Sequence, residues 1–194
     1  GPATRIRDRS MDPKKLYELG FHPSSICGTF GAVASAAYLL NVNTKQTIKA
    51  LGLAALQTSG LMAWEDDPKE DARPFQMGIA ARNGVTATLL AKNNFGGPDR
   101  IFDGGHNVFK AFSRSYSTAP MIDKLGISWD GVMKLAIKPY SCVSFLHPAL
   151  DALDKLLFEN NLKSTDLDKI ILSFPSSGCH CIAVSYTHLT LPTN

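Results

Sequence analysis

The sequence of 194 residues lacks strong charge of either sign and lacks any long apolar run. Charged residues make up only 19% of the chain, and the net charge is +3. Because no block of lysine and arginine is present, a nucleic-acid partner is not indicated. No apolar stretch reaches the roughly 18–20 residues that a membrane-spanning helix needs. The sequence therefore predicts a protein that binds neither nucleic acid nor a membrane.

Cysteine is also scarce. The four cysteines, Cys27, Cys142, Cys179 and Cys181, are too few and too scattered for a disulfide scaffold, and we expect free thiols in a reducing cytosol. The tripeptide 179–181 (CHC) could suggest zinc, but the second ligand pair of a usual zinc site is missing. No nucleotide-binding loop or nucleophile elbow is found either. These absences predict a cytoplasmic protein without a metal site.

What is present describes a chain that forms a core, since hydrophobic residues make up 44% of it. The two ends differ from the rest. Residues 1–10 have no apolar periodicity and resemble a tail left by expression and cleavage, and residues 185–194 resemble translated cloning sequence. Between them we expect a partial helical domain over 11–128 and a partial α+β domain over 129–184.

Apolar periodicity and turn residues predict the helices. They are expected over 11–19, 23–40, 45–60, 72–92, 98–103, 107–112, 118–125 and 147–160. Thr44 is the expected N-cap of helix 45–60, with Thr47 in place of the usual capping-box acid. Helix 23–40 is rich in glycine, alanine and serine, so another backbone or a ligand could approach it closely. The acidic stretch 64–71 (WEDDPKED) is expected to be a solvated loop.

Beyond residue 128 the composition changes. Stretches 129–137 and 169–174 have strand character, and helix 147–160 lies between them. The expected buried side of that helix consists of Leu150, Leu153, Leu156 and Leu157. Strand, helix, strand predicts the start of an α+β unit, and it is expected to be truncated because two strands cannot easily shield their edges.

Two helix starts share one layout. His22 precedes Pro23, and Arg73 precedes Pro74. A cation-capable side chain beside the unpaired N–H groups of a helix N-terminus suits a di- or tricarboxylate, although each pair is equally well explained as an ordinary helix start. Thr58 and Ser59, near the expected end of helix 45–60, suit a pocket wall as well as a helix end.

Three motifs follow one another along the chain, and together they carry a resemblance to a known family. They are 20–31 (GFHPSSICGTFG), 73–81 (RPFQMGIAA) and 138–147 (KPYSCVSFLH). With them, residues 16–184 resemble the MmgE/PrpD family, which includes 2-methylcitrate dehydratase, cis-aconitate decarboxylase and an iminodisuccinate epimerase. Members are more than twice as long as this chain, which resembles the middle of such a protein.

The resemblance implies a mainly α fold. The expected architecture is a helical bundle, the family's first domain, followed by the truncated start of an α+β lid domain, with the pocket between the two. It also implies an enzyme that acts on a small polycarboxylate without a cofactor, and we expect a homodimer.

The resemblance assigns roles by position. His22 matches a pocket histidine implicated in proton transfer, and Lys138 matches a lysine that faces the carboxylates of the substrate. His147 matches a histidine at the head of the following helix. Arg73 stands where the decarboxylases and many other members have lysine, and Gln76 stands where histidine is frequent. The arginine keeps the charge but replaces a point donor with a planar fork.

The leading hypothesis is a lyase that dehydrates a 2-methylcitrate-like acid, with His22 and Lys138 as catalytic residues. The expected substrate-binding residues are Arg73, His147, Thr58, Ser59 and Gln76. Alternatives within the enzyme class are cis-aconitate-type decarboxylation, against which Val143 counts because decarboxylases have a histidine there, and iminodisuccinate-type epimerisation. The alternative of another class is an inactive fragment that acts only as a helical self-association module.

Overall fold

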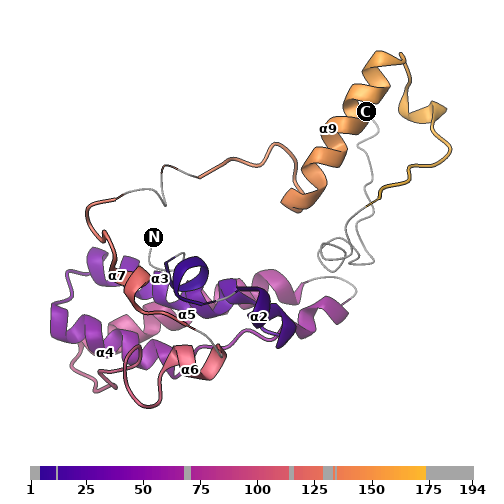
Figure 1. Ribbon diagram of the computed structural model, residues 1–194. Coiled ribbons are helices and arrows are strands. Elements are labelled where there is room, and N and C mark those ends of the chain that lie inside the picture. The colour runs from indigo at the N-terminus through magenta and orange to yellow at the C-terminus, as the bar shows by residue number, and fades with distance from the viewer. Residues whose placement is uncertain are drawn as a thin grey trace. The chain divides into compact units, whose positions relative to one another are not determined.

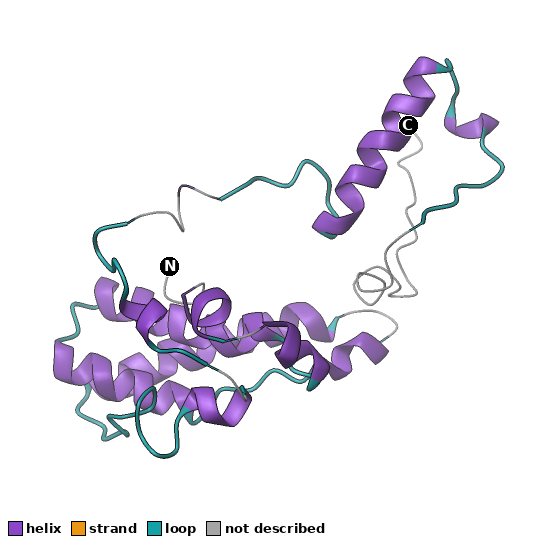
Figure 2. Ribbon diagram, viewed as in Figure 1, coloured by secondary structure: helices purple, strands orange, loops and turns teal. Residues whose placement is uncertain are grey.

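The computed structural model describes residues 5–11, 13–67, 71–113, 116–128, 133 and 135–173, which form two units dividing after residue 134 (Figure 1). Within these residues the regular structure is helical and no strand is formed (Figure 2). The first unit contains η1 (Arg5–Ser10), α2 (Pro13–Glu18), α3 (Pro23–Leu39), α4 (Thr44–Ala55), η2 (Met62–Asp66), α5 (Ala72–Lys92), α6 (Val108–Phe112) and α7 (Ala119–Ile122). The second contains η3 (Ser144–Leu146), α9 (His147–Glu159) and η4 (Ser164–Asp166). The prediction of a mainly α fold is confirmed.

The first unit is organised around α3, α4 and α5, each of which contacts the other two (Figure 1). Helices α3 and α5 cross very closely at Gly84. A Cβ atom placed on Gly84 would lie 2.6 Å from the carbonyl oxygen of Thr29 and 2.5 Å from the Cβ of Ala32. The small residues of α3 therefore let another backbone approach it, as the composition of that helix indicates.

The main core of this unit lies between α3 and the segments that precede it and follow α5. Its buried residues are Ile6, Met11, Leu16, Ile26, Cys27, Phe30, Ile101, Val108 and Phe109. The ring of Phe102 lies 5.3 Å from Phe30 and 5.7 Å from Phe109 between centroids, and burial of each such side chain contributes roughly 1.5–3 kcal/mol. Residues 1–10 are expected to lie outside the fold, yet η1 is a π-helix and its Ile6 is part of this core.

Helix α4 begins one residue earlier than predicted. Asn43, not Thr44, is the N-cap, and its Oδ1 accepts from the backbone N–H of Gln46 at 3.0 Å. The Gln46 side chain in turn accepts from the backbone N–H of Asn43 at 3.4 Å, which completes a capping box. The sequence signal for this capping box is therefore Asn43 with Gln46 three residues later, since an amide oxygen accepts the capping hydrogen bond as well as a carboxylate does.

We expect Asn43→Ala to lower the free energy of unfolding by about 1 kcal/mol, the usual contribution of an N-cap side chain. Thr44→Ala is the matched control, because Thr44 is the first residue of the helix and its replacement leaves both capping hydrogen bonds in place. Chemical denaturation of the two variants measures the difference. Equal destabilisation by both substitutions would contradict the cap assignment.

Helix α4 ends at Ala55, five residues before the predicted end at Gly60, and residues 60–62 pair with another segment. Phe21 and Leu61 form an antiparallel bridge. On either side of it the N–H of His22 donates to the carbonyl of Gly60 at 2.6 Å, and the N–H of Met62 donates to the carbonyl of Gly20 at 2.9 Å. We call this pairing of 20–22 with 60–62 the bridge segment. Leu61 has extended backbone angles in this pairing (φ −61°, ψ 141°), so the chain has left the helical conformation before it.

The acidic stretch 64–71, predicted as a solvated loop, is in part ordered and buried. Its first residues belong to η2, and the side chain of Trp64 is only 8% exposed because it packs against His22 and Arg73. Helix α5 matches its predicted range of 72–92. Residues 98–103 form turns instead of the predicted helix, and α7 is shorter than 118–125 because Lys124 and Gly126 have positive φ values of 51° and 78°.

The second unit departs most from prediction. Residues 135–137 and 169–173 are not strands, since no neighbouring segment among the described residues supplies a hydrogen-bonding partner; 129–132, 134 and 174 lie outside the described residues. Helix α9 matches 147–160 to within one residue. Its predicted buried side is only half-buried at Leu150, Leu153 and Leu157, and Leu156 is 56% exposed, because no described element packs over it.

Candidate functional site

The predicted catalytic histidine lies at the N-cap of α3. His22 is half-buried and has extended backbone angles (φ −89°, ψ 108°), and Pro23 follows it at the first helical position. Its backbone is fixed by the bridge segment, since its N–H donates to the carbonyl of Gly60. Its ring meets the ring of Trp64 edge-on, with centroids 5.6 Å apart at 73°. Main chain and ring are thus both held in place.

A chain of hydrogen bonds links His22 to α5. The Nδ1 atom of His22 lies 3.4 Å from the hydroxyl of Ser25, one turn further along α3. That hydroxyl donates to the Oε1 atom of Gln76 at 2.6 Å, and the Nε2 atom of Gln76 donates to the carbonyl of Leu61 at 2.7 Å. The predicted binding residue Gln76 is therefore connected to the predicted catalytic residue through a serine that sequence reasoning missed.

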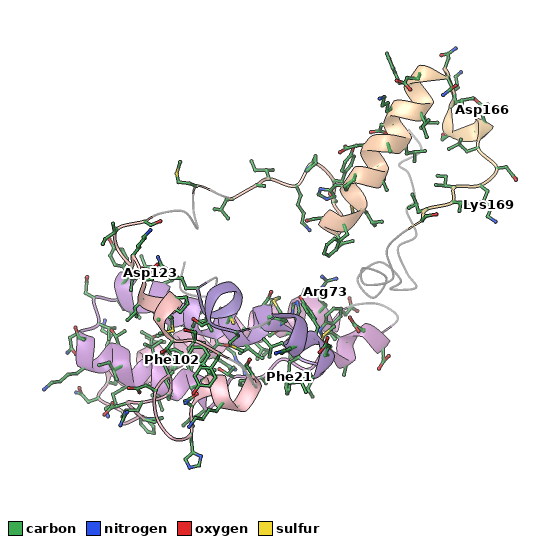
Figure 3. All side chains as sticks on the ribbon, viewed as in Figure 1. Phe21, Arg73, Phe102, Asp123, Asp166 and Lys169 are labelled. Atoms are coloured by element: carbon green, nitrogen blue, oxygen red, sulfur yellow. The ribbon has the colours of Figure 1, made fainter. Side chains whose placement is uncertain are left out.

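Arg73 lies one turn before Gln76 on α5. Its guanidinium carbon stands 4.8 Å from the centroid of the Trp64 ring, a cation–π contact. Because His22 meets the same ring edge-on, Trp64 joins the beginnings of α3 and α5. Figure 3 labels Arg73 and Phe21, the residue before His22, and both lie toward the right-hand end of the first unit. The structure thus brings together His22, Arg73 and Gln76.

Ser59 and Thr58 occupy different environments. Ser59 lines a small cavity together with Ser25, Thr29, Gln57, Gln76, Ile79, Ala80 and Asn83. Thr58 does not line this cavity, since its hydroxyl donates to the carbonyl of Ala54 at 3.0 Å and closes the end of α4. Of Thr58 and Ser59, only Ser59 therefore lies beside Gln76.

Sequence reasoning missed three residues of this region: Ser25, Trp64 and Asn83. Ser25 could have been found, because a position three residues after His22 on a helix lies on the same face. Asn83 is buried, donates to the carbonyl of Gln57 at 3.3 Å, and lies seven residues after Gln76, again on one face of α5. Trp64 gave a weaker signal, a single large aromatic residue within an acidic stretch.

The second unit holds the other two predicted residues. Lys138 is exposed, and its Nζ donates to the carbonyl of Cys142 at 2.9 Å. His147 begins α9; its ring lies 5.4 Å from that of Tyr140, and its buried Nε2 atom has no hydrogen-bond partner among the described residues.

Tyr140 has the clearest titration shift among the groups that the structure describes. Its hydroxyl donates its proton to the carboxylate of Asp151 at 2.8 Å, and the carboxylate of Asp154 lies 3.2 Å from the same hydroxyl. The hydrogen bond to Asp151 is the main cause that raises the pKa of Tyr140 to about 12, and desolvation and the negative charges of both carboxylates add to it. Tyr140 therefore remains a neutral donor at physiological pH.

The described residues include no group of three histidine, cysteine, aspartate or glutamate side chains placed to hold a metal ion. Cys27 and Cys142 are free thiols, whereas Cys179 and Cys181 lie outside the described residues. None of the helices that the structure describes has the length and apolar character needed to cross a membrane.

Comparison with known proteins places this sequence in a family. The sequence pattern of the MmgE/PrpD N-terminal domain matches residues 5–120. The chain belongs to the MmgE/PrpD family. The match includes the whole arrangement around His22, Arg73 and Gln76, whereas Lys138 and His147 lie after it.

Relatives of this MmgE/PrpD chain are 28–33% identical to it over the matched residues. It is 28% identical over 148 residues to the cis-aconitate decarboxylase-like protein oryM of Aspergillus oryzae, with 73% of this chain and 30% of the relative covered. It is 28% identical over 162 residues to human cis-aconitate decarboxylase (80% and 33% covered). It is 33% identical over 97 residues to mouse cis-aconitate decarboxylase (50% and 19% covered). The chain thus spans a third or less of these relatives.

Proposed function

We propose that this chain carries part of the site of a lyase that acts on a small di- or tricarboxylic acid. The observation that carries the proposal is that His22 and Arg73 both contact the ring of Trp64, where α3 and α5 begin. Membership of a family whose matched relatives bear the name cis-aconitate decarboxylase supports it.

The chemistry of these side chains suits a polycarboxylate. Loss of carbon dioxide or water from a citrate-like acid passes through negative charge on a carbon beside a carboxylate, and a proton must be moved there. A histidine changes its protonation state near neutral pH and can shuttle that proton, which is the role proposed for His22. The planar guanidinium of Arg73 can bind a carboxylate through two parallel hydrogen bonds. For the second unit we propose Lys138 as a catalytic residue and His147 as a substrate-binding residue, the roles that the family resemblance implies.

Two reactions are compatible with this site, and different observations favour each. Decarboxylation of a cis-aconitate-like acid is our first candidate, because the matched relatives bear that name. Dehydration of a 2-methylcitrate-like acid is the second, because Arg73 and Val143 depart from the lysine and histidine expected of a decarboxylase. Release of carbon dioxide from cis-aconitate, compared with loss of water from 2-methylcitrate, distinguishes them.

A second class of function, self-association, is favoured by a different observation. Tyr38 and Leu39, at the end of α3, are 83% and 76% exposed, and large apolar side chains that gather on a surface mark contacts with other chains. We propose that the protein is a cytoplasmic homodimer that uses such surfaces. If association were the whole function, the apparent molecular mass in solution would rise with protein concentration, and no carboxylic acid would bind.

Isothermal calorimetry with citrate, 2-methylcitrate and cis-aconitate tests the proposed site. We expect Arg73→Ala to weaken binding on the order of tenfold to a hundredfold, the usual loss for a hydrogen bond to a charged group. Arg100→Ala is the matched control, because Arg100 is an exposed arginine of the same unit that pairs with Asp103. Absence of heat from the folded wild-type chain with all three acids would contradict the proposal for this chain.

A further inference from the structure

We propose that Ser25 and Gln76 are positioning residues that fix the tautomer of His22, with the ring proton on Nδ1 and the lone pair on Nε2. The role of this tautomer in proton transfer rests on the proposed function, whereas the tautomer itself follows from hydrogen bonds within the first unit. Neutral histidine has one donor and one acceptor nitrogen, and its neighbours decide which is which.

The backbone carbonyl oxygen of Leu61 can only accept hydrogen bonds. The end of the Gln76 side chain that lies 2.7 Å from this oxygen must therefore be the NH2 group. This fixes the orientation of the amide, and its Oε1 atom faces the hydroxyl of Ser25 at 2.6 Å.

The Ser25 hydroxyl can donate to only one of its two neighbours, Gln76 or His22, because it has a single proton. The Oε1 atom of Gln76 is an acceptor, so the proton of Ser25 is donated to it. Toward His22 the serine oxygen then offers only lone pairs, and the Nδ1 atom 3.4 Å away must carry a hydrogen to bond with it. Ser25 is only 2% exposed, so bulk water has little access to reorganise this chain.

The opposite arrangement leaves two acceptors in contact. If Ser25 donated to Nδ1 of His22, Gln76 would have to turn its NH2 group toward Ser25. Its Oε1 atom would then face the carbonyl oxygen of Leu61 across the 2.7 Å contact with no proton between them. We expect the Nδ1–H tautomer to exceed the other on the order of tenfold, since an unmade hydrogen bond at a half-buried position is costly.

The tautomer of His22 decides which of its two ring nitrogens can accept a proton. With Nδ1 protonated and turned toward Ser25, Nε2 is the nitrogen that has a lone pair and can accept a proton from a substrate. Gln76 thereby acts on the base through Ser25, and Ser25 has no proton-transfer role of its own.

Nitrogen-15 NMR of the labelled 194-residue chain at alkaline pH, where imidazole is neutral, reads the tautomer of His22 directly. We expect Nδ1 of His22 to have the shift of a protonated nitrogen and Nε2 that of an unprotonated one. Gln76→Leu should invert this pattern, because the Ser25 proton is then released to donate to Nδ1. Ser25→Ala should give a mixture of both tautomers.

Ser35→Ala is the matched control, since this serine lies on the same helix and donates to the carbonyl of Gly31 instead. It should leave the His22 spectrum unchanged. A wild-type spectrum with the proton on Nε2 would overturn the inference without any variant, and so would an unchanged pattern in folded Gln76→Leu. Calorimetric failure to bind carboxylic acids, with the Nδ1–H pattern present, would instead count against the proposed function alone.

Discussion

Replacing His22 with glutamine should lower the rate of carbon dioxide or water release from a polycarboxylate by about 10²–10⁴-fold, the usual contribution of a positioned acid or base. Glutamine can still form hydrogen bonds at the start of α3, but it cannot take up a proton at neutral pH. Binding of the acid, measured by calorimetry, should change much less than turnover. Such a split indicates a role in proton transfer and not in folding.

The control for this substitution is His106→Gln. His106 is an exposed histidine in a turn of the same unit, so its replacement makes the same chemical change away from Trp64 and Ser25. Equal turnover in the two variants would contradict the assignment of His22. Absence of turnover in the wild-type chain, with binding intact, would show that this chain alone does not perform the reaction.

Replacing Gly84 with alanine should destabilise the first unit by about 1–3 kcal/mol, the usual cost of an extra methyl group in a tightly packed position. The new Cβ would lie 2.6 Å from the Thr29 carbonyl and 2.5 Å from the Cβ of Ala32, so α3 and α5 would have to separate. Urea denaturation followed by circular dichroism measures the change in the free energy of unfolding.

Gly78→Ala is the matched control on the same helix. A Cβ at Gly78 meets no atom within 4 Å, so the substitution should stabilise α5 by roughly 0.5–1 kcal/mol through helix propensity alone. The two identical substitutions should therefore act in opposite directions. If Gly84→Ala stabilised the protein as well, the close crossing of α3 and α5 would be wrong.

Local signals in the sequence predicted α3 and α5 well. Pro23 and Pro74 mark the starts of α3 and α5 because proline fits a first helical turn, and both helices lie within about one residue of their predicted ranges. The end of α4 could not be predicted in this way. Residues 60–62, which the sequence assigned in part to this helix, pair with 20–22, and a contact between residues 40 positions apart leaves no periodicity in the sequence.

The strand prediction failed for a related reason. A short apolar run such as 169–173 fits a strand or an irregular segment equally well. Which of the two it forms depends on whether a neighbouring strand completes its hydrogen bonds. Among the described residues of the second unit no such neighbour is present, so these stretches remain without regular structure.

The candidate site was predicted in part. His22, Arg73 and Gln76 were selected by helix-start layout and family resemblance, and the structure places them around Trp64 and Ser25. The link between them could not be predicted, because the bond from Ser25 to Gln76 joins residues 51 positions apart. Lys138 and His147 belong to the second unit, and their part in the site remains a prediction.

The bridge segment has a consequence for how this part of the molecule can respond to a ligand. Two amides, those of His22 and Met62, are tied across it on either side of the Phe21–Leu61 pair, and Trp64 follows two residues later. The histidine and tryptophan rings are therefore carried by one stiff piece of backbone with little freedom to hinge. Under the proposed function, differently shaped acids would have to be accommodated by side-chain rotation, above all that of the long arginine at position 73.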